Sequence, residues 1–158
     1  MKNIEEANKI IHKAFEFHSK GNILEAAKYY QSFIDKGFKD YRVFTNYGVI
    51  FANLGKLQDA ETYYRKAIAL KPTFANAHSN LGNVLRDLRK FQDAEVSIRK
   101  AIALNPDLAE AHSNLGNVLR DLGKLEEAEL SICKAIELKP DLVKAYYSIS
   151  QFKVLNTI

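Results

Sequence analysis

The sequence predicts an all-α fold, an α-solenoid of stacked antiparallel helix pairs. Twelve residues, Ala77 to Leu88, return without a change from Ala111 to Leu122, which is 34 positions later. The three prolines of the chain, Pro72, Pro106 and Pro140, are spaced by the same 34 residues. Within each repeat the apolar residues recur at helical spacing and are interrupted once. A period of this length is typical of stacked supersecondary units, each made here of two helices.

The array is predicted to form a single domain over residues 1–158. Its units lie at about residues 4–37, 40–72, 73–106 and 107–140, and a capping helix follows at 141–154. The first unit is degenerate, as expected of a terminal unit that has only one neighbour. The second has an aromatic first helix. The third and fourth are the purest copies, because 23 of 32 positions are identical between 75–106 and 109–140.

Turns and helix starts also repeat. Gly55 and Gly123 mark the break between the two helices of a unit, and Arg89 holds the equivalent place in the third unit. A positive φ at this place costs Arg89 about 1 kcal/mol or less, whereas a helical turn makes arginine harmless. Thr73 is an expected N-cap, and Asp107 with an acidic residue three positions later resembles a capping box.

Composition limits the classes of function. The chain has 23 Lys and Arg against 19 Asp and Glu, and the two signs are interleaved, so no basic patch for nucleic acid is expected. Cys133 is the only cysteine, which excludes an intrachain disulfide and predicts a surface thiol. The first residues lack the apolar core of a signal peptide, and the sequence contains no run of about 18 apolar residues. We therefore expect a soluble, cytoplasmic protein that does not bind a membrane.

Catalytic and metal chemistry are not expected. His78 and His112 are one repeat apart, which separates them by about 10 Å in stacked helix pairs, too far for two ligands of one zinc ion. They are predicted to be packing residues. The sequence has no nucleophile beside a base, no glycine-rich phosphate loop and no CxxC pair. We expect neither an enzyme nor a cofactor.

Bulky and small residues alternate in a fixed order in each unit. The second unit has Phe44, Tyr47-Gly48, Phe51, Ala60, Tyr64, Ala67 and Pro72, and the fourth has His112, Leu115-Gly116, Leu119, Ala128, Ile132, Ala135 and Pro140. This order, with its period of 34, resembles the tetratricopeptide repeat (TPR) family. The resemblance implies a right-handed superhelix whose first helices line a concave face. A pentatricopeptide array is the nearest rival, but its period is one residue longer and it lacks this Gly, Ala and Pro set.

The first helices repeat polar residues at positions expected to be exposed. The candidate peptide-binding residues are Asn46, Asn80, Asn114, Asn83, Asn117, Arg86, Arg120, Asp87, Asp121, Ser79 and Ser113. An asparagine amide can donate to and accept from the peptide groups of an extended ligand. The first three resemble the asparagine ladder in the TPR superhelix of a protein-glycosylating sugar transferase. The alternative stays open that the asparagines satisfy polar groups of the repeat itself.

The charged residues of this set have two interpretations as well. Arginine and aspartate of successive units can pair with each other, or they can contact a ligand. The chaperone-tail readers of the TPR family hold a terminal carboxylate with cations near these asparagines. Ser79, Asp87 and Asp121 stand at the matching places here, which disfavours such a clamp.

Three functions are compatible with this sequence. The leading one is a non-catalytic scaffold that binds a peptide or helix of a partner protein in the concave groove. The second is a structural array that self-associates through the C-terminal helix into a homo-oligomer. The third is a targeting segment of a larger transferase-type protein, suggested because the sequence stops within a fifth unit.

Overall fold

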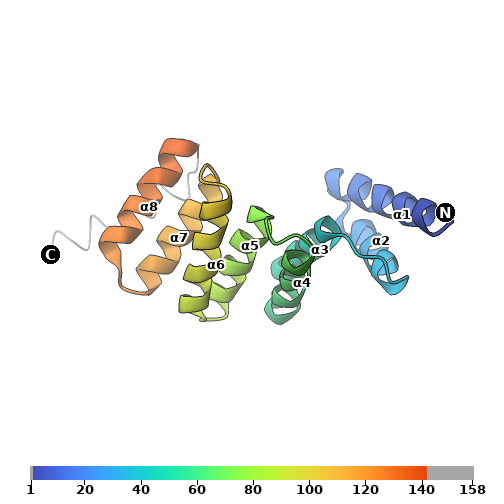
Figure 1. Ribbon diagram of the computed structural model, residues 1–158, viewed down its shortest axis with the longest axis horizontal. Helices are drawn as coiled ribbons and strands as arrows, with labels where there is room; N and C mark the ends of the chain where they lie inside the picture. The colour runs from blue at the N-terminus through green and yellow to red at the C-terminus, as the bar shows by residue number, and fades with distance from the viewer. Residues whose placement is uncertain (1, 142–158) are drawn as a thin grey trace. The chain divides into compact units, whose positions relative to one another are not determined.

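The computed structural model describes residues 2–141, and this part of the chain consists of helices joined by short turns, without any strand (Figure 1). Its helices are α1 (Lys2–Ser19), α2 (Ile23–Asp35), α3 (Tyr41–Asn53), α4 (Leu57–Leu70), α5 (Ala75–Asp87), α6 (Phe91–Leu104), α7 (Ala109–Asp121) and α8 (Leu125–Leu138). The predicted all-α fold is confirmed. The predicted capping helix at 141–154, and self-association through it, lie outside the described residues except for Asp141.

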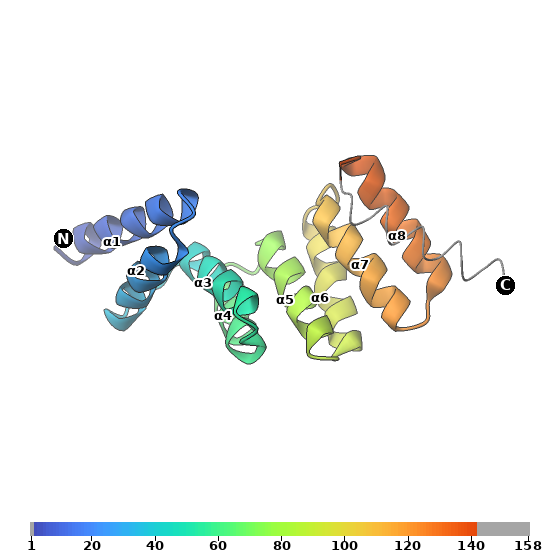
Figure 2. The same ribbon diagram turned by 180° about the vertical axis from the view of Figure 1, so that it is seen from behind.

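The helices pack as consecutive pairs. The most extensive contacts join α1 to α2, α3 to α4, α5 to α6 and α7 to α8, and both ribbon views show each pair side by side (Figures 1 and 2). Three residues separate the two helices of every pair. So short a turn makes the helices of a pair antiparallel. Stacked pairs of this kind define the α-solenoid class that the sequence predicts.

The chain divides into two compact units, Met1–Pro72 and Thr73–Ile158. Unit 1 contains α1 to α4, and the described part of unit 2 contains α5 to α8. In unit 1, α2 packs on α3, and in unit 2 both α5 and α6 pack on α7. Successive pairs therefore stack within each unit. A single array over the whole chain stays a prediction.

Glycine lets the two helices of a pair approach closely in unit 2. A Cβ built on Gly82 would overlap the Ile98 side chain and lie 3.1 Å from the Ala94 carbonyl oxygen. Gly116 faces Ile132 in the same way. Both isoleucines are fully buried, so they have no room to withdraw. Small residues therefore stand where the two helices of each pair cross in unit 2.

The turn between paired helices needs a left-handed residue. Gly55 and Gly123 have φ values of 72° and 76°, and Arg89 takes 64° at the equivalent place. The Arg89 N–H donates to the Arg86 carbonyl at 2.9 Å, and the Lys90 N–H donates to the Leu85 carbonyl at 2.8 Å. These bonds close the end of α5 in the way that helices commonly end. Of the two alternatives for Arg89, the strained one is therefore observed.

The predicted caps at the starts of α5 and α7 are wrong. The N-cap residues are Phe74 and Leu108, and neither makes a side-chain capping hydrogen bond. Thr73 and Asp107 come one residue too early, because the residue after each proline still belongs to the turn. Glu110, the expected partner in the capping box, instead binds Lys139 at 2.9 Å.

The core of unit 1 is centred on a buried tyrosine. Tyr30 on α2 is fully buried. Its hydroxyl oxygen accepts a hydrogen bond from Asn46 Nδ2 on α3 at 3.1 Å and lies 2.9 Å from His18 Nδ1 on α1. Burial raises the pKa of the Tyr30 phenol, so the hydroxyl stays protonated. One hydroxyl thus connects three helices from two successive pairs.

Candidate functional site

In unit 2, α5 and α7 pack against each other and repeat the same polar residues. We call these residues the polar face: Asn80, Asn83, Arg86 and Asp87 on α5, with Asn114, Asn117, Arg120 and Asp121 on α7. The helical register buries Leu81, Val84 and Leu85 of α5 in the core. The asparagines and arginines of the polar face are half-buried, and its two aspartates are exposed.

The arginine and aspartate ladders pair across the two helices. Arg86 Nε on α5 donates to Asp121 Oδ2 on α7 at 2.6 Å, and each side chain is 27% exposed. Arg86 Nη1 also lies 3.9 Å from Asp87 Oδ1. Pairing between repeats, one of the two interpretations drawn from the sequence, is thus observed for Arg86. At this exposure such a pair stabilises by about 0–1 kcal/mol, and its main effect is to hold the guanidinium in place.

Two of the ladder asparagines bind groups of the protein itself. Asn114 Nδ2 on α7 donates to Ser79 Oγ on α5 at 3.2 Å, and Asn46 in unit 1 donates to the Tyr30 hydroxyl. In both cases the amide reaches the preceding repeat. These two asparagines therefore hold successive repeats in register, whether or not a ligand is bound.

The serines of the candidate set are not surface residues. Ser79 and Ser113 are only 3% and 9% exposed, and Thr45 at the equivalent place in unit 1 is 5% exposed. The expectation that this ladder is exposed is wrong. These positions turn toward the neighbouring repeat, where a small side chain permits contact, and Ser79 accepts the hydrogen bond from Asn114 there. Thr45 instead donates to the Tyr41 carbonyl at 2.8 Å.

Asn80 borders an open hollow of about 250 Å³ in unit 2. We call it the polar hollow; its lining residues are Asn76, Ser79, Asn80, Leu108 and Glu110. The hydrogen bond from Lys139 lowers the pKa of the Glu110 carboxyl, which is therefore ionised near neutral pH. The polar hollow combines amide groups and one carboxylate, so it suits hydrogen-bond donors and disfavours a second carboxylate.

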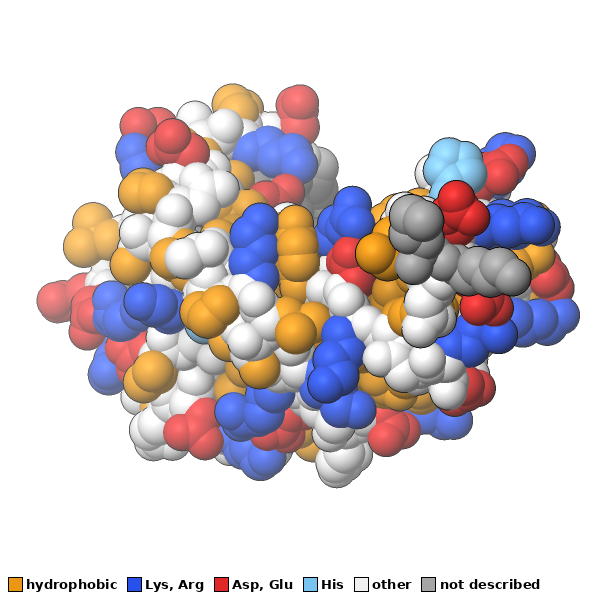
Figure 3. Space-filling model, turned by 45° about the vertical axis from the view of Figure 1, so that its right-hand side comes forward, with side chains coloured by type: hydrophobic (Ala, Val, Ile, Leu, Met, Phe, Trp, Pro, Cys, Tyr) orange, Lys and Arg blue, Asp and Glu red, His pale blue; other side chains and the backbone are white. Residues whose placement is uncertain are grey.

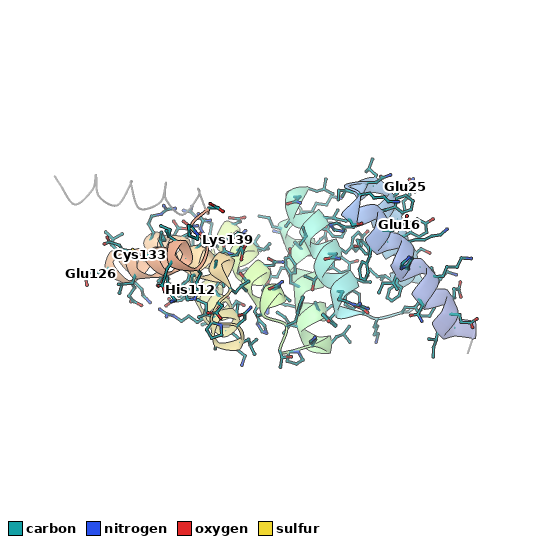
Figure 4. All side chains as sticks on the ribbon, turned by 90° about the horizontal axis from the view of Figure 1, so that it is seen from above. Glu16, Glu25, His112, Glu126, Cys133 and Lys139 are labelled. Atoms are coloured by element: carbon teal, nitrogen blue, oxygen red, sulfur yellow. The ribbon has the colours of Figure 1, made fainter. Side chains whose placement is uncertain are left out.

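Cys133 is a surface thiol, as the sequence predicts, and His112 contacts the turn before its own helix. The half-buried His112 has Nε2 2.8 Å from the Pro106 carbonyl oxygen, which ties α7 to the turn before it. Cys133 is exposed on α8 (Figure 4). Among the described residues, no group of three His, Cys, Asp or Glu side chains is arranged to hold a metal ion. None of the helices within residues 2–141 has the length and apolarity that crossing a membrane requires.

Charges of both signs are mixed over the surface. On the face drawn in Figure 3, Lys and Arg side chains alternate with Asp and Glu. In unit 2 the second helices form an ion-pair network, since Arg99 of α6 binds Glu95 at 2.9 Å and Glu127 of α8 at 2.8 Å. Lys124 also binds Glu95 at 2.9 Å. This network joins α6 to α8.

The structure also contains two apolar hollows that the sequence analysis missed. One lies in unit 1 and includes Ile34 and Phe44, and the other lies in unit 2 and includes Ile102 and His112. Both are lined largely by the second helices of successive pairs. The 34-residue period offers a signal for them. Ile34 and Ile102 are 68 positions apart, which is two periods, and so are Phe44 and His112.

Helix pairs joined by three-residue turns, glycine at the crossings in unit 2 and polar side chains repeated on its first helices define a helical-repeat protein of the α-solenoid class. Sequence profiles identify the family. A profile described as "Tetratricopeptide repeat" matches residues 79–142, one described as "TPR repeat" matches 48–88, and a further "Tetratricopeptide repeat" profile matches 12–34. The chain belongs to the tetratricopeptide repeat family. A search of curated proteins finds no match.

Solved structures of similar fold are numerous. The crystal structure of MamA is 26% identical, covers 91% of this chain and 84% of its own, and has a TM-score of 0.78. MamA from Desulfovibrio magneticus RS-1 is 24% identical, with coverage of 96% and 85% and a TM-score of 0.81. The first TPR of Spaghetti (RPAP3), solved bound to the HSP90 peptide SRMEEVD, is 26% identical, with coverage of 75% and 94% and a TM-score of 0.71.

Proposed function

We propose that this chain is a non-catalytic protein-interaction scaffold that binds a peptide or helix of a partner protein on the polar face of α5 and α7. The observation that carries the proposal is the placement of Asn80 and Asn83. Both amides are half-buried on α5, and Asn80 borders the polar hollow. A half-buried amide that is held by its helix can bind a peptide group without first paying much conformational entropy.

The chemistry of the polar face restricts the partner segment. Arg86 is already paired with Asp121, and the polar hollow carries the carboxylate of Glu110. Arg86 and Lys139, which pair with Asp121 and Glu110, are therefore not free to bind an acidic segment. We expect the amides to bind backbone groups of the partner, with neutral or basic side chains lying beside Glu110 and Asp87.

A similar structure supports binding of a peptide as the mode of action. The first TPR of Spaghetti (RPAP3), 26% identical to this chain, was solved with an HSP90 peptide. Its peptide ends in acidic and apolar residues, whereas the polar face here favours neutral or basic ones. From this similar structure we infer only that the chain binds a peptide, and not which peptide sequence it prefers.

Selection from an unbiased peptide library, followed by titration of the best peptide, tests the proposal. Asn80→Ala with Asn83→Ala removes two amides, each worth about 0.5–1.5 kcal/mol as a hydrogen-bonding group. Affinity should therefore fall about tenfold. Asn114 is left intact because it holds the repeats together. Gln92→Ala, an exposed amide on α6, is the matched control and should leave the affinity unchanged. Equal affinity of the double variant and the control for the peptide would show that the polar face does not bind it.

A further inference from the structure

The apolar hollow of unit 1 is open and carries positive charge only. We call it the α2–α4 hollow; it measures about 350 Å³ and is lined by Ile34, Phe38, Phe44, Leu70, Lys39 and Lys66. Its volume lies at the lower end of the range of about 300–1,000 Å³ seen for ligand pockets. That volume suits one or two side chains of a peptide. Leu70 remains 44% exposed, so a large apolar surface stays open to solvent there.

Within unit 1, the hollow and the ladder residue Asn46 lie on different sides of α3. Phe44 in its wall and Asn46 of the ladder are two residues apart on α3. Because successive residues are about 100° apart around an α-helix, the two side chains leave α3 on nearly opposite sides. A ligand of the hollow would therefore lie on a different side of α3 from Asn46.

Aromatic rings hold one of the two lysines. Lys66 Nζ lies 4.9 Å from the centroid of Tyr63 and 5.9 Å from that of Phe44. Within the described part of the chain, no carboxylate forms an ion pair with Lys66 or Lys39. The wall of the hollow thus presents two ammonium groups beside apolar surface, and no carboxylate within residues 2–141 neutralises either of them.

Unit 2 has a hollow at corresponding positions of the repeat, and the cations that line it form ion pairs with carboxylates. We call it the α6–α8 hollow; Ile102, His112 and Lys134 line it at the positions that match Ile34, Phe44 and Lys66. There Lys134 binds Glu137 at 3.0 Å. The residue that matches Glu137 in unit 1 is Ala69, which has no carboxylate.

Arg99, the other cation of the α6–α8 hollow, is also paired, with Glu95 and Glu127. The two hollows therefore share three lining positions of the repeat and differ in free charge.

We infer that the α2–α4 hollow is a second docking site, and that its occupant is a peptide segment in which an aromatic or aliphatic side chain is followed directly by acidic residues. The apolar side chain fills the space between Ile34, Phe38 and Leu70. The carboxylates meet Lys66 and Lys39. Charge complementarity selects this occupant over a basic or neutral segment, and the α6–α8 hollow does not select it because its cations are already paired.

The probe is the capped peptide acetyl-Gly-Ser-Phe-Asp-Asp-Ser-Gly-amide, titrated into the full ¹⁵N-labelled chain and followed by backbone amide chemical shifts. Shifts should concentrate at the residues of the α2–α4 hollow. Two further peptides serve as controls, one with glycine in place of phenylalanine and one with two lysines in place of the aspartates. Both should fail to produce the shifts.

Ala69→Glu is the decisive variant, since it gives Lys66 the carboxylate that Lys134 has in unit 2. It should weaken binding of the probe about three- to fivefold, the effect of satisfying one exposed charge. Position 69 is exposed, so we expect the variant to fold normally, which circular dichroism would check. Glu137→Ala changes the α6–α8 hollow alone and should leave the affinity of the α2–α4 hollow unchanged.

Several results would overturn the inference. They are an absence of shifts up to about millimolar peptide, the weak limit of recognition, equal binding of the lysine peptide, and unchanged affinity of Ala69→Glu. Shifts that depend on protein concentration without any peptide would identify a second copy of the chain as the occupant, and would also contradict the inference.

Discussion

Arg89 takes a backbone conformation that other units give to glycine. Its φ of 64° matches the 72° to 76° of Gly55 and Gly123, where a Cβ would meet no atom within 4 Å. The cost at Arg89 is therefore that of the left-handed conformation alone and not of a clash. Its guanidinium, 5.3 Å from the centroid of the Phe91 ring, recovers part of this cost through a cation–π contact.

Replacing Arg89 tests this view of the turn. Both Arg89→Gly and Arg89→Ala lose the contact with Phe91, but only glycine relieves the left-handed conformation. Arg89→Gly should be more stable to denaturant than Arg89→Ala by about 1 kcal/mol. If the alanine variant is equally stable, the turn imposes no strain.

Gly82 shows how tightly the paired helices approach. A methyl group there would overlap Ile98, so Gly82→Ala should lower the free energy of unfolding by about 1–3 kcal/mol. The same substitution in an Ile98→Ala background should cost much less, because the overlapping atoms are gone. Denaturant unfolding of the four proteins measures the coupling, and additive effects would show that the two residues do not compete for space.

Tyr30 joins three helices through one hydroxyl. Tyr30→Phe keeps the ring and removes the partner of Asn46 and of His18. We expect a loss of about 1 kcal/mol in the free energy of unfolding, since one hydroxyl and its bonds are lost in a buried place. Tyr29→Phe on the same helix, at a half-buried ring, is the control. A similar loss in both variants would show that the Tyr30 hydroxyl plays no special role.

At the scale of elements, ion pairs connect the second helices of unit 2. Glu95 of α6 binds Arg99 of the same helix and Lys124, the residue that precedes α8. The hydrogen bond from Lys124, with that from Arg99, lowers the pKa of the Glu95 carboxyl against the effect of burial. A carboxyl whose pKa is lower in the folded state stabilises the fold above its unfolded pKa of about 4.3. This contribution is lost as the pH falls through the folded-state pKa.

Glu95→Gln tests the sign and the pH window of this effect. Near neutral pH the variant should be less stable by about 1 kcal/mol or less, as expected for a partly exposed ion pair. The difference should shrink toward zero as the pH falls below about 4. Glu129→Gln, at an exposed position on α8 outside this ion-pair network, is the matched control and should leave the stability near neutral pH unchanged. A difference for Glu95→Gln that persists in acid would mean that packing rather than charge is at work.

The elements also show how far the sequence predicts the fold and the site. The 34-residue period locates the helix pairs, and the spacing of glycine and alanine predicts their close approach, because both depend on contacts within one repeat. The roles of the polar residues depend on the neighbouring repeat. Asn114 reaches Ser79 across two helices, and only coordinates show that this asparagine is occupied while Ser79 is buried.

The α2–α4 hollow escaped the sequence analysis for a similar reason. Its wall combines residues from two second helices and the turn between the pairs, so no single repeat contains it. For the lysine that both hollows share, Lys66 against Lys134, the difference in pairing arises from one position, Ala69 against Glu137. The sequence alone does not reveal the importance of this difference, because only the structure places Lys66 beside an open apolar surface.

At the scale of the whole molecule, the two compact units carry different surfaces. Unit 2 presents the polar face with the polar hollow, and unit 1 presents the apolar α2–α4 hollow with free lysines. A scaffold of helical repeats can bind more than one partner segment in this way, because each unit folds the same framework under different side chains.

The most direct test of the proposed scaffold is to map the bound peptide. A library-selected peptide that carries a photo-crosslinking residue is bound to the intact chain, and the crosslinked residues are identified by mass spectrometry. The account predicts crosslinks on α5 and α7 around Asn80, Asn83 and Asn117. Crosslinks confined to α6 and α8 would contradict the assignment of the polar face as the peptide-binding surface.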